Sequence, residues 1–239
     1  MTAAKIILVR HGESIANVAA TAAEAAGAEV IDVTARDADV PLSALGEQQA
    51  AALRPRLDAE LGVDGYGARV WSSPYLRAVS TAHLALGDRP FLTDERLRDR
   101  ELGILDALTA RGVDARLPDE AARRRWLGKF YYRPPGGEAW TDVALRLRSF
   151  VSELAASDGR TVLLFTHDAV VSLFLYILLG WTEAQLNDFL IDRVVGNATV
   201  TTLVADGAGW QVESFSDDAH LEAAGLPTTE HPGAARVTE

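Results

Sequence analysis

An arginine and a histidine follow directly after a short, strongly apolar run near the start of the sequence. Residues 6–9 are Ile-Ile-Leu-Val, and Arg10, His11 and Gly12 come next. An unbroken β-forming run is typical of a strand buried on both faces of a parallel sheet. The alanine-rich residues 13–26 indicate a helix. Strand-to-helix junctions of α/β sheets bind ligands, and helix amides there favour anions, so this segment predicts an anion site with a nucleophilic histidine. The alternative is a polar turn in which Gly12 supplies backbone freedom.

A second junction of this kind follows residues 68–71, which predict a short strand. Ser72, Ser73 and Pro74 come next, and we expect a hydroxyl cap followed by proline at the first position of a helix. This helix carries Arg77 in its first turn.

A third junction follows residues 161–165, which predict another buried strand. His167 lies at its end, before an apolar helix over residues 169–179. The carboxyl ends of parallel strands share one sheet edge, so two histidines and two arginines are expected to converge there. A buried histidine bonded to backbone carbonyls is the alternative for each imidazole.

The rest of the chain supplies the elements that position these residues. The sequence predicts a loop over residues 28–40, followed by a helix that Ser43 caps and Pro55 kinks or ends. Residues 91–105 predict a charged surface segment, and residues 138–156 an amphipathic helix. Residues 198–204 and 210–215 predict a hairpin at the edge of the sheet. Residues 104–137 predict a helical and loop insertion over the sheet edge, and residues 221–239 a mobile tail. The fold class is α/β, a three-layer sandwich with a mostly parallel central sheet, helices on both faces and the insertion capping the active-site edge.

Composition excludes several classes of protein. The formal charge of −11 disfavours nucleic-acid and anionic-membrane partners, although it allows a local cationic pocket. Without cysteine there is no disulfide and no thiolate metal site. The longest apolar stretch, residues 162–179, is interrupted by a polar tripeptide, and the N-terminus lacks the pattern of a secretory signal, so we expect a cytoplasmic protein. A dinucleotide-binding protein and a serine hydrolase are disfavoured because the sequence has no Gly-x-Gly-x-x-Gly and no Gly-x-Ser-x-Gly.

An ordered set of motifs over roughly residues 5–215 resembles the histidine phosphatase superfamily, in its phosphoglycerate mutase-like, Arg-His-Gly-Glu branch. The matching segments are Leu8-Val9-Arg10-His11-Gly12-Glu13-Ser14 with Asn17, Leu42-Ser43 with Gly46 and Gln49-Ala50, Ser72-Ser73-Pro74 with Arg77-Ala78 and Thr81-Ala82, Leu97-Arg98-Asp99 with Gly103, Pro135-Gly136-Gly137-Glu138, Thr166-His167, and Asn197-Ala198. The resemblance implies one phosphoglycerate mutase-like domain over residues 1–239.

The resemblance also implies roles for the converging residues. His11 becomes the nucleophile that carries a phosphoryl group, and Arg10, Arg77 and His167 surround the phosphate oxygens. Asn17 adds a neutral hydrogen bond. Such a site needs no metal and no cofactor, and its partner is a small phosphorylated substrate.

The general acid that protonates the leaving group is the least regular part of the resemblance. In the family it lies four residues before a glycine, usually as glutamate, and Asp99 before Gly103 matches that position with a shorter side chain. Glu101 and Asp168 are the alternatives. A neighbouring phosphate dianion raises the pKa of such an acid and keeps it protonated.

Two other functions remain open besides phosphomonoester hydrolysis. One is phosphoryl transfer of the phosphoglycerate mutase type, which we place second because residues 106–111 lack the lysine of the mutases. The other is a catalytically weak regulator that binds a phosphorylated ligand. The insertion residues Arg123, Arg124, Arg125, Lys129, Tyr131, Tyr132 and Arg133 either contact the substrate or form a solvated helix face. The sequence leaves the substrate's identity and the oligomeric state open.

Overall fold

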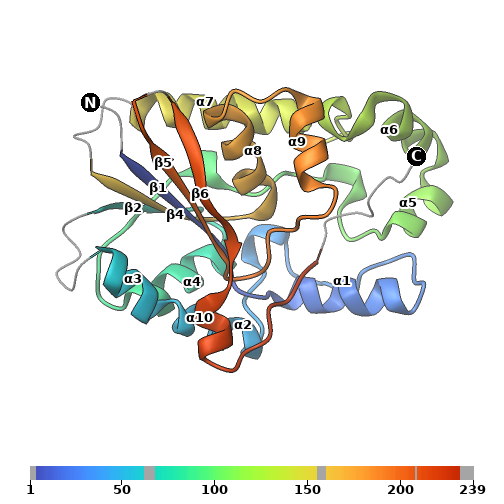
Figure 1. Ribbon diagram of the computed structural model, residues 1–239. Coiled ribbons are helices and arrows are strands. Elements are labelled where there is room, and N and C mark those ends of the chain that lie inside the picture. The colour runs from blue at the N-terminus through green and yellow to red at the C-terminus, as the bar shows by residue number, and fades with distance from the viewer. Residues whose placement is uncertain (1–3, 62–67, 155–159, 208, 232–239) are drawn as a thin grey trace.

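A six-stranded mixed sheet forms the centre of the molecule in a computed structural model, which describes residues 4–61, 68–154, 160–207 and 209–231 (Figure 1). Its order is β3-β2-β4-β1-β5-β6. The bounds are β1 (Lys5–Arg10), β2 (Ala68–Ser72), β3 (Leu92–Thr93), β4 (Thr161–Thr166), β5 (Val200–Ala205) and β6 (Trp210–Asp217). Strands β1 to β4 are parallel to one another, and β5 and β6 form an antiparallel hairpin at one edge. The predicted mostly parallel α/β sheet is confirmed.

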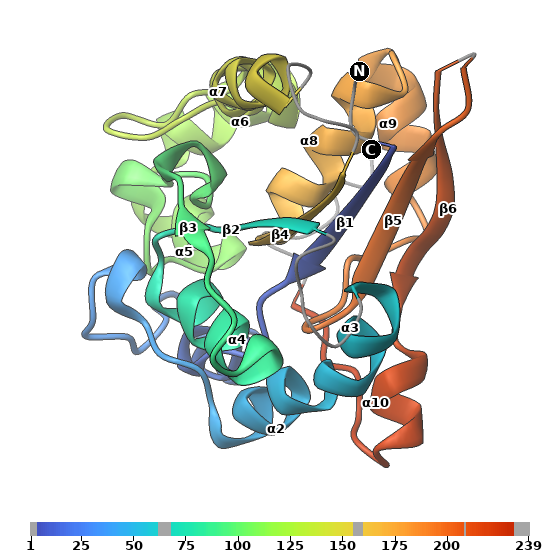
Figure 2. The same cartoon turned by 90° about the vertical axis from the view of Figure 1, so that its left-hand side faces the viewer.

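Helices cover both faces of this sheet (Figures 1 and 2). The helices are α1 (Ile15–Ala25), α2 (Ala44–Ala52), α3 (Arg54–Leu61), α4 (Leu76–Leu86), α5 (Ala110–Arg116), α6 (Pro118–Tyr131), α7 (Trp140–Leu154), α8 (Asp168–Leu178), α9 (Glu183–Leu190) and α10 (Ala219–Ala223), with three short 3₁₀ turns, η1 (Asp37–Asp39), η2 (Glu95–Leu97) and η3 (Gly103–Leu105). Helices α7, α8 and α9 lie on one face, and α2, α3, α4 and α10 on the other. The predicted break at Pro55 is confirmed, because this residue lies in the first turn of α3.

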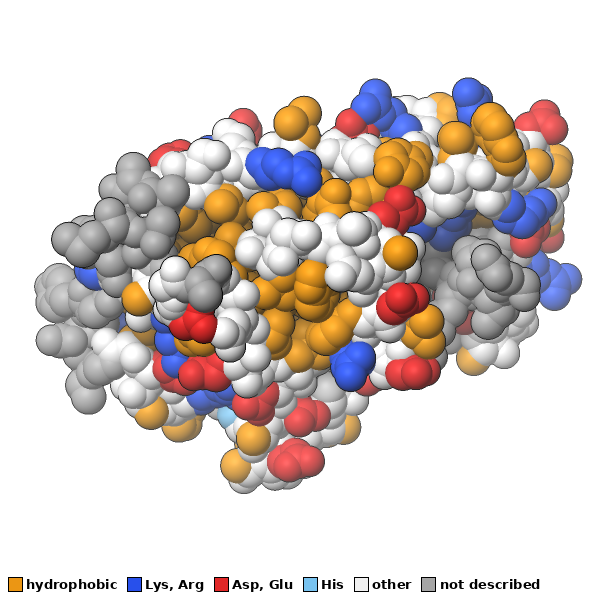
Figure 3. Space-filling view, turned by 45° about the horizontal axis from the view of Figure 1, so that its top comes forward, with side chains coloured by type: hydrophobic (Ala, Val, Ile, Leu, Met, Phe, Trp, Pro, Cys, Tyr) orange, Lys and Arg blue, Asp and Glu red, His pale blue; other side chains and the backbone are white. Residues whose placement is uncertain are grey.

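Alternate residues of the central strands enter two separate cores. Ile6 and Leu8 of β1 pack with α7 and α8, whereas Ile7 and Val9 pack with α3 and α4. All four side chains are fully buried, which is why their sequence shows no polar alternation. Apolar side chains also reach the outside, where the space-filling view shows a broad apolar area (Figure 3).

Two glycines fix the turn that carries His11. A Cβ atom on Gly12 would lie 2.4 Å from the carbonyl oxygen of Gly46, and one on Gly46 would lie 1.9 Å from that of Glu13. Only glycine allows this approach between the β1–α1 turn and α2. The motif glycines therefore determine where His11 stands.

The structure corrects two details of the sequence prediction. Helix α4 begins at Leu76 with Tyr75 as its N-cap, so Ser73 does not cap it and Pro74 is not its first residue. Ser73 Oγ accepts a hydrogen bond from the Tyr75 amide at 3.3 Å and lies 2.9 Å from His167 Nε2, so it stabilises the turn before the helix and contacts the second histidine. The segment predicted as a charged surface contains the edge strand β3, which is too short and too exposed to show a pattern.

The predicted insertion contains η3, α5 and α6, which share a small apolar cluster of Leu105, Val113, Ala121 and Tyr132. Gly103 joins it to the sheet edge: its φ is +56°, and an added Cβ would lie 2.2 Å from the Pro135 carbonyl oxygen.

Residues 221–231, which the sequence predicts to be mobile, lie against the domain. The Pro227 carbonyl accepts a hydrogen bond from Gln49, and the Thr229 carbonyl accepts one from the Asn197 amide. The rest of the predicted tail lies outside the described residues. Among those described, no helix is long and apolar enough to cross a membrane.

Candidate active site

His11 follows β1 and is 3% exposed. Its Nδ1 lies 2.7 Å from the carbonyl oxygen of Gly12, and its Nε2 lies 3.2 Å from Arg77 Nε. A carbonyl only accepts and a guanidinium only donates, so both contacts require the neutral tautomer with its lone pair on Nε2. Burial, with Arg77, His167 and Arg10, lowers the pKa of His11 well below its usual value. The imidazole is therefore a neutral base with a defined nucleophilic nitrogen.

Arg77 connects this imidazole to two carboxylates. Its Nη1 donates to the backbone carbonyl of Asp37 at 2.6 Å and to Asp37 Oδ1 at 3.0 Å. Its Nη2 donates to Asp37 Oδ2 at 3.3 Å and to Asp99 Oδ2 at 3.1 Å. Helix α4 begins directly before Arg77 and holds the guanidinium at the sheet edge.

His167 ends β4 and is fully buried beside His11, with ring centroids 5.1 Å apart. Its Nε2 lies 2.9 Å from Ser73 Oγ, and its Nδ1 lies 3.3 Å from Asp99 Oδ2. Burial lowers the pKa of His167, although the Asp99 carboxylate opposes the shift. The second histidine is thus held between a hydroxyl and a carboxylate, at the same sheet edge as the first.

Arg10 is the last residue of β1, and Asn17 lies in the first turn of α1. The Arg10 guanidinium donates to the Val195 carbonyl, and its buried Nε makes no hydrogen bond within the described residues. Asn17 Oδ1 accepts from Ser14 in a capping box and from Asn197, which leaves the amide Nδ2 of Asn17 as the group able to donate. Asn197 also donates to the His11 carbonyl, which links Asn17 to the turn that carries His11.

The three candidate acids have different surroundings. Asp99 contacts both Arg77 and His167, and its Oδ1 accepts from the Arg100 amide. Burial alone would raise the pKa of Asp99, but His167 and Arg77 hold it well below its usual range. Glu101 instead accepts from the Tyr75 hydroxyl, and Asp168 from the amide after it at the start of α8.

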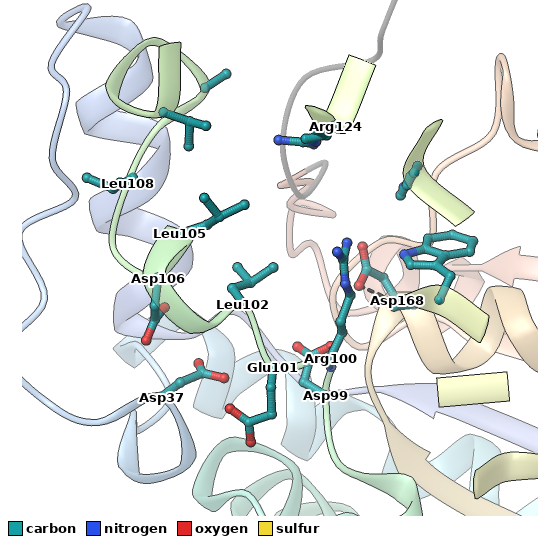
Figure 4. A pocket seen from close by; sticks show the side chains of 15 residues that line it. Asp37, Asp99, Arg100, Glu101, Leu102, Leu105, Asp106, Leu108, Arg124 and Asp168 are labelled. Atoms are coloured by element: carbon teal, nitrogen blue, oxygen red, sulfur yellow. Dashed lines mark hydrogen bonds between the residues drawn. The ribbon is translucent and has the colours of Figure 1, made fainter. Parts of the chain in front are cut away.

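A pocket of about 190 Å³ lies between this cluster and the insertion (Figure 4). Asp37, Asp99 and Glu101 gather at one end, and Arg124 lies at the other. The residues lining it are Asp37, Asp99, Arg100, Glu101, Leu102, Leu105, Asp106, Leu108, Ala110, Val113, Arg124, Lys129, Trp140, Asp168 and Ala169. The pocket combines an apolar wall with charges of both signs.

The insertion residues divide between this pocket and the surface. Arg124 and Lys129 line the pocket, and the Lys129 ammonium lies 4.2 Å from the Trp140 ring centroid. On a regular helix, Arg124 and Lys129 would point in different directions because they are five residues apart. Helix α6 is kinked between them at Gly128, where φ is +74°, and both side chains line the same pocket. The others lie elsewhere: Arg125 pairs with Asp114, Arg133 pairs with Asp142, Tyr132 donates to Glu120, and Arg123 and Tyr131 line a second, shallower depression.

Four residues at the site were not assigned a role from sequence. Asp37 lies in a loop without periodicity, and the sequence around Ser73 predicts a helix cap instead. Thr81 accepts a hydrogen bond from the Gly12 amide, and Asn197 donates to the His11 carbonyl. Thr81 and Asn197 belong to the resembling motifs, and that resemblance was the only signal for them.

The arrangement combines a neutral nucleophile with buried cations and a nearby carboxyl group, which suits transfer of a phosphoryl group. Within the described part of the chain, no three His, Asp or Glu side chains are grouped to hold a metal ion.

Comparison with known proteins agrees with this geometry. A family model described as histidine phosphatase superfamily (branch 1) matches residues 6–218. The chain is 33% identical over 191 residues to glucosyl-3-phosphoglycerate phosphatase of Mycolicibacterium vanbaalenii, covering 75% of this chain and 76% of that protein. It is 31% identical over 195 residues to 2,3-bisphosphoglycerate-dependent phosphoglycerate mutase of Methylobacterium radiotolerans, covering 78% and 84%.

Solved structures extend the similarity to the fold. The mycobacterial glucosyl-3-phosphoglycerate phosphatase in complex with VO3 superposes with a TM-score of 0.70 at 28% identity, covering 90% of this chain and 99% of that one. A structure described as mycobacterial hydrolase 1 gives a TM-score of 0.70 at 29% identity, covering 89% and 98%. The family match spans the whole sheet and every junction described above, and the chain belongs to the histidine phosphatase superfamily, branch 1.

Proposed function

We propose that this protein is a phosphatase that hydrolyses small phosphomonoesters through a phosphohistidine formed on Nε2 of His11. The observation that carries the proposal is the fixed tautomer of His11, whose lone pair points at the Arg77 guanidinium. The ring centroid of His167 lies 5.1 Å from that of His11. Close relatives named as phosphatases support the same reaction.

The reaction has two steps. The Nε2 lone pair attacks phosphorus, the ester P–O bond breaks, and the leaving alkoxide takes a proton from an acid. A water molecule then attacks phosphorus and gives a proton to the conjugate base of that acid. The P–N bond breaks, its electron pair returns to His11 Nε2, and inorganic phosphate is released. Arg10, Arg77 and His167 stabilise the charge on the equatorial oxygens. The Nδ1–H bond to Gly12 stabilises the positive charge that the ring acquires.

Asp99 is the acid in this scheme, because it alone of the three candidates contacts both Arg77 and His167. In this structure His167, Arg77 and the Arg100 amide hold the pKa of Asp99 low, so its carboxyl group is ionised. A phosphate dianion placed against the same groups neutralises them and adds negative charge beside Asp99, so its pKa rises and it can hold a proton.

We favour water, rather than a second phosphorylated substrate, as the acceptor of the phosphoryl group from His11. The specific support is that proteins named as glucosyl-3-phosphoglycerate phosphatase are 33% identical to this chain in the sequence comparison and 28% identical in the structural one. Phosphoryl transfer of the mutase type is the second candidate, favoured by the 31% identical mutase relative.

The substrate carries a second anionic group besides its phosphate. Arg100, Arg124 and Lys129 face the same pocket. Burial and the neighbouring Arg124 together lower the pKa of Arg100 to about 10. Loss of solvent likewise lowers the pKa of Lys129, with Arg100 and Arg124 contributing. Cations that repel one another are stabilised by an anion, and a carboxylate attached to the phosphorylated carbon skeleton meets this need.

The first prediction concerns the covalent intermediate. Mixing the protein with a ³²P-labelled phosphomonoester and quenching in alkali traps acid-labile, alkali-stable label on His11, mapped by mass spectrometry, because phosphorus bonds to nitrogen. His11→Ala carries no label, whereas the surface variant His83→Ala labels like the parent. Turnover without label on His11 would contradict the mechanism.

The second prediction concerns protonation. Because the folded-state pKa of His11 lies below the ordinary value of 6.5, the ring stays neutral and nucleophilic as pH falls through 6.5 and loses its lone pair only at lower pH. Nitrogen-15 NMR of labelled histidines reports this directly. In Arg77→Ala the titration midpoint of His11 moves up, since a positive neighbour is lost. A midpoint at or above 6.5 in the parent protein would be inconsistent with the proposed tautomer.

The third prediction identifies the acid. Asp99→Asn slows hydrolysis of glycerol phosphate, which has a poor leaving group, by about 10²–10⁴-fold, and slows p-nitrophenyl phosphate far less, because nitrophenolate leaves without a proton. Glu101→Gln and Asp168→Asn affect both substrates alike. The assignment is wrong if Asp99→Asn matches the parent protein on both substrates.

The fourth prediction tests the second anionic group. The parent protein prefers 3-phosphoglycerate to glycerol 3-phosphate by about ten- to a hundredfold in kcat/KM, the range expected for charge-assisted hydrogen bonds. Arg124→Ala removes the preference and spares glycerol 3-phosphate. Arg125→Ala is the matched control, since this neighbour on the same helix pairs with Asp114 at the surface. An unchanged preference in Arg124→Ala would rule out this role of the cluster.

A further inference from the structure

We propose that Asp37 is an internal ligand of the phosphate site, whose carboxylate occupies the N–H groups of Arg77 that an incoming phosphoryl group must take over. The inference rests on the proposed function, because it assumes that Arg77 binds the substrate phosphate. It adds a role for the 28–40 loop: Asp37 makes phosphate alone a weak ligand and favours esters that have further contacts in the pocket.

The hydrogen bonds of Arg77 carry the first step. A guanidinium has five N–H groups. One donates to His11 Nε2, and one to Asp99 Oδ2. The other three donate to Asp37, at its backbone carbonyl and both carboxylate oxygens. All five are engaged. The Nε–H is released when the His11 lone pair turns to phosphorus, but a phosphate oxygen can bind the Nη1 and Nη2 groups only by displacing a carboxylate.

Asp37 is the acceptor that can leave. Asp99 is fixed by His167 and by the Arg100 amide, and its backbone carbonyl accepts from Arg146 at 3.0 Å. The hydrogen bonds of the Asp37 carboxylate go to Arg77, and the residue stands on a short 3₁₀ turn preceded by exposed residues 34–36. Burial raises the pKa of Asp37 despite the adjacent Arg77, whereas that of Asp99 is held low. Asp37 is thus the carboxylate held less favourably.

The shape of the pocket supports the same role. Asp37 and Asp99 belong to its wall, while His11 and Arg77 are only 3% and 4% exposed and do not line it. The two carboxylates therefore lie between the pocket and the nucleophile. A phosphate dianion entering beside both would meet strong repulsion, and withdrawal of Asp37 removes one of these charges and opens the path to His11.

This arrangement makes affinity depend on the rest of the substrate. Displacing Asp37 costs free energy. Inorganic phosphate offsets this cost only by its own contacts with the phosphate site. An ester whose second anionic group reaches Arg124 gains additional contacts and displaces Asp37 more readily. Asp37 is in this sense a specificity-determining residue, and it also favours release of the phosphate product.

The test is binding of inorganic phosphate measured by isothermal titration calorimetry, which needs no turnover. Asp37→Asn and Asp37→Ala bind phosphate about ten- to a hundredfold more tightly than the parent protein, the range expected when a charged competitor is removed. The inhibition constant of phosphate against p-nitrophenyl phosphate falls in parallel. Asp39→Asn is the matched control: its side chain, on the same turn, pairs with the exposed Arg36, and its phosphate affinity is unchanged.

The sign of the change separates this role from a merely structural one. If Asp37 only braced Arg77, both variants would bind phosphate more weakly, and that result, or unchanged affinity, would overturn the inference while leaving hydrolysis through His11 intact. In an Arg77→Ala background the Asp37→Asn substitution has a much smaller effect, because the contested N–H groups are gone and only the repulsion between Asp37 and phosphate remains. No phosphate binding by any variant, Asp37→Ala included, would overturn both this inference and the proposed phosphate site.

Discussion

The buried guanidinium of Arg77 is the interaction on which the site depends. It fixes the lone pair of His11, binds Asp99 and Asp37, and so joins four segments that are distant in the sequence. A buried cation is stable only with such partners, since removal from water is costly unless charge and hydrogen bonds compensate. In the proposed function the same guanidinium binds the phosphoryl group of the substrate, and binding then exchanges one anion for another at this residue.

The sheet edge and the insertion have separate tasks. Strand ends and close glycine contacts set the positions of His11 and His167, which differ little in burial from the core around them. The insertion supplies Arg124 and Lys129, which line the pocket beside the sheet edge. In the proposed function the sheet edge carries the chemistry, and the insertion, with its own small apolar cluster, contacts the remainder of the substrate. This division is consistent with one superfamily holding relatives named as phosphatases and as mutases.

Much of this arrangement is predictable from sequence, because strands buried on both faces leave continuous apolar runs whose ends mark the functional edge. Arg10, His11, Arg77 and His167 all follow such runs. The start of α4 was misplaced because Ser73 and Pro74 imitate a helix cap, while the Ser73 hydroxyl is used by His167. Strand β3 was missed because two exposed residues carry no period. The role of Asp37 is not predictable from sequence for a related reason. Loops lack periodicity, and only the folded chain brings this carboxylate to Arg77. The direction of Arg124 depended on the kink at Gly128, which no helical pattern reveals.

Vanadate offers the most direct test of the convergence, since it adopts the five-coordinate geometry of the phosphoryl group in transfer. A crystal structure of this protein with vanadate should show vanadium bonded to Nε2 of His11, with its equatorial oxygens in hydrogen-bond contact with Arg10, Arg77 and His167. Vanadium bonded to any other side chain, or located away from these three residues, would contradict the account.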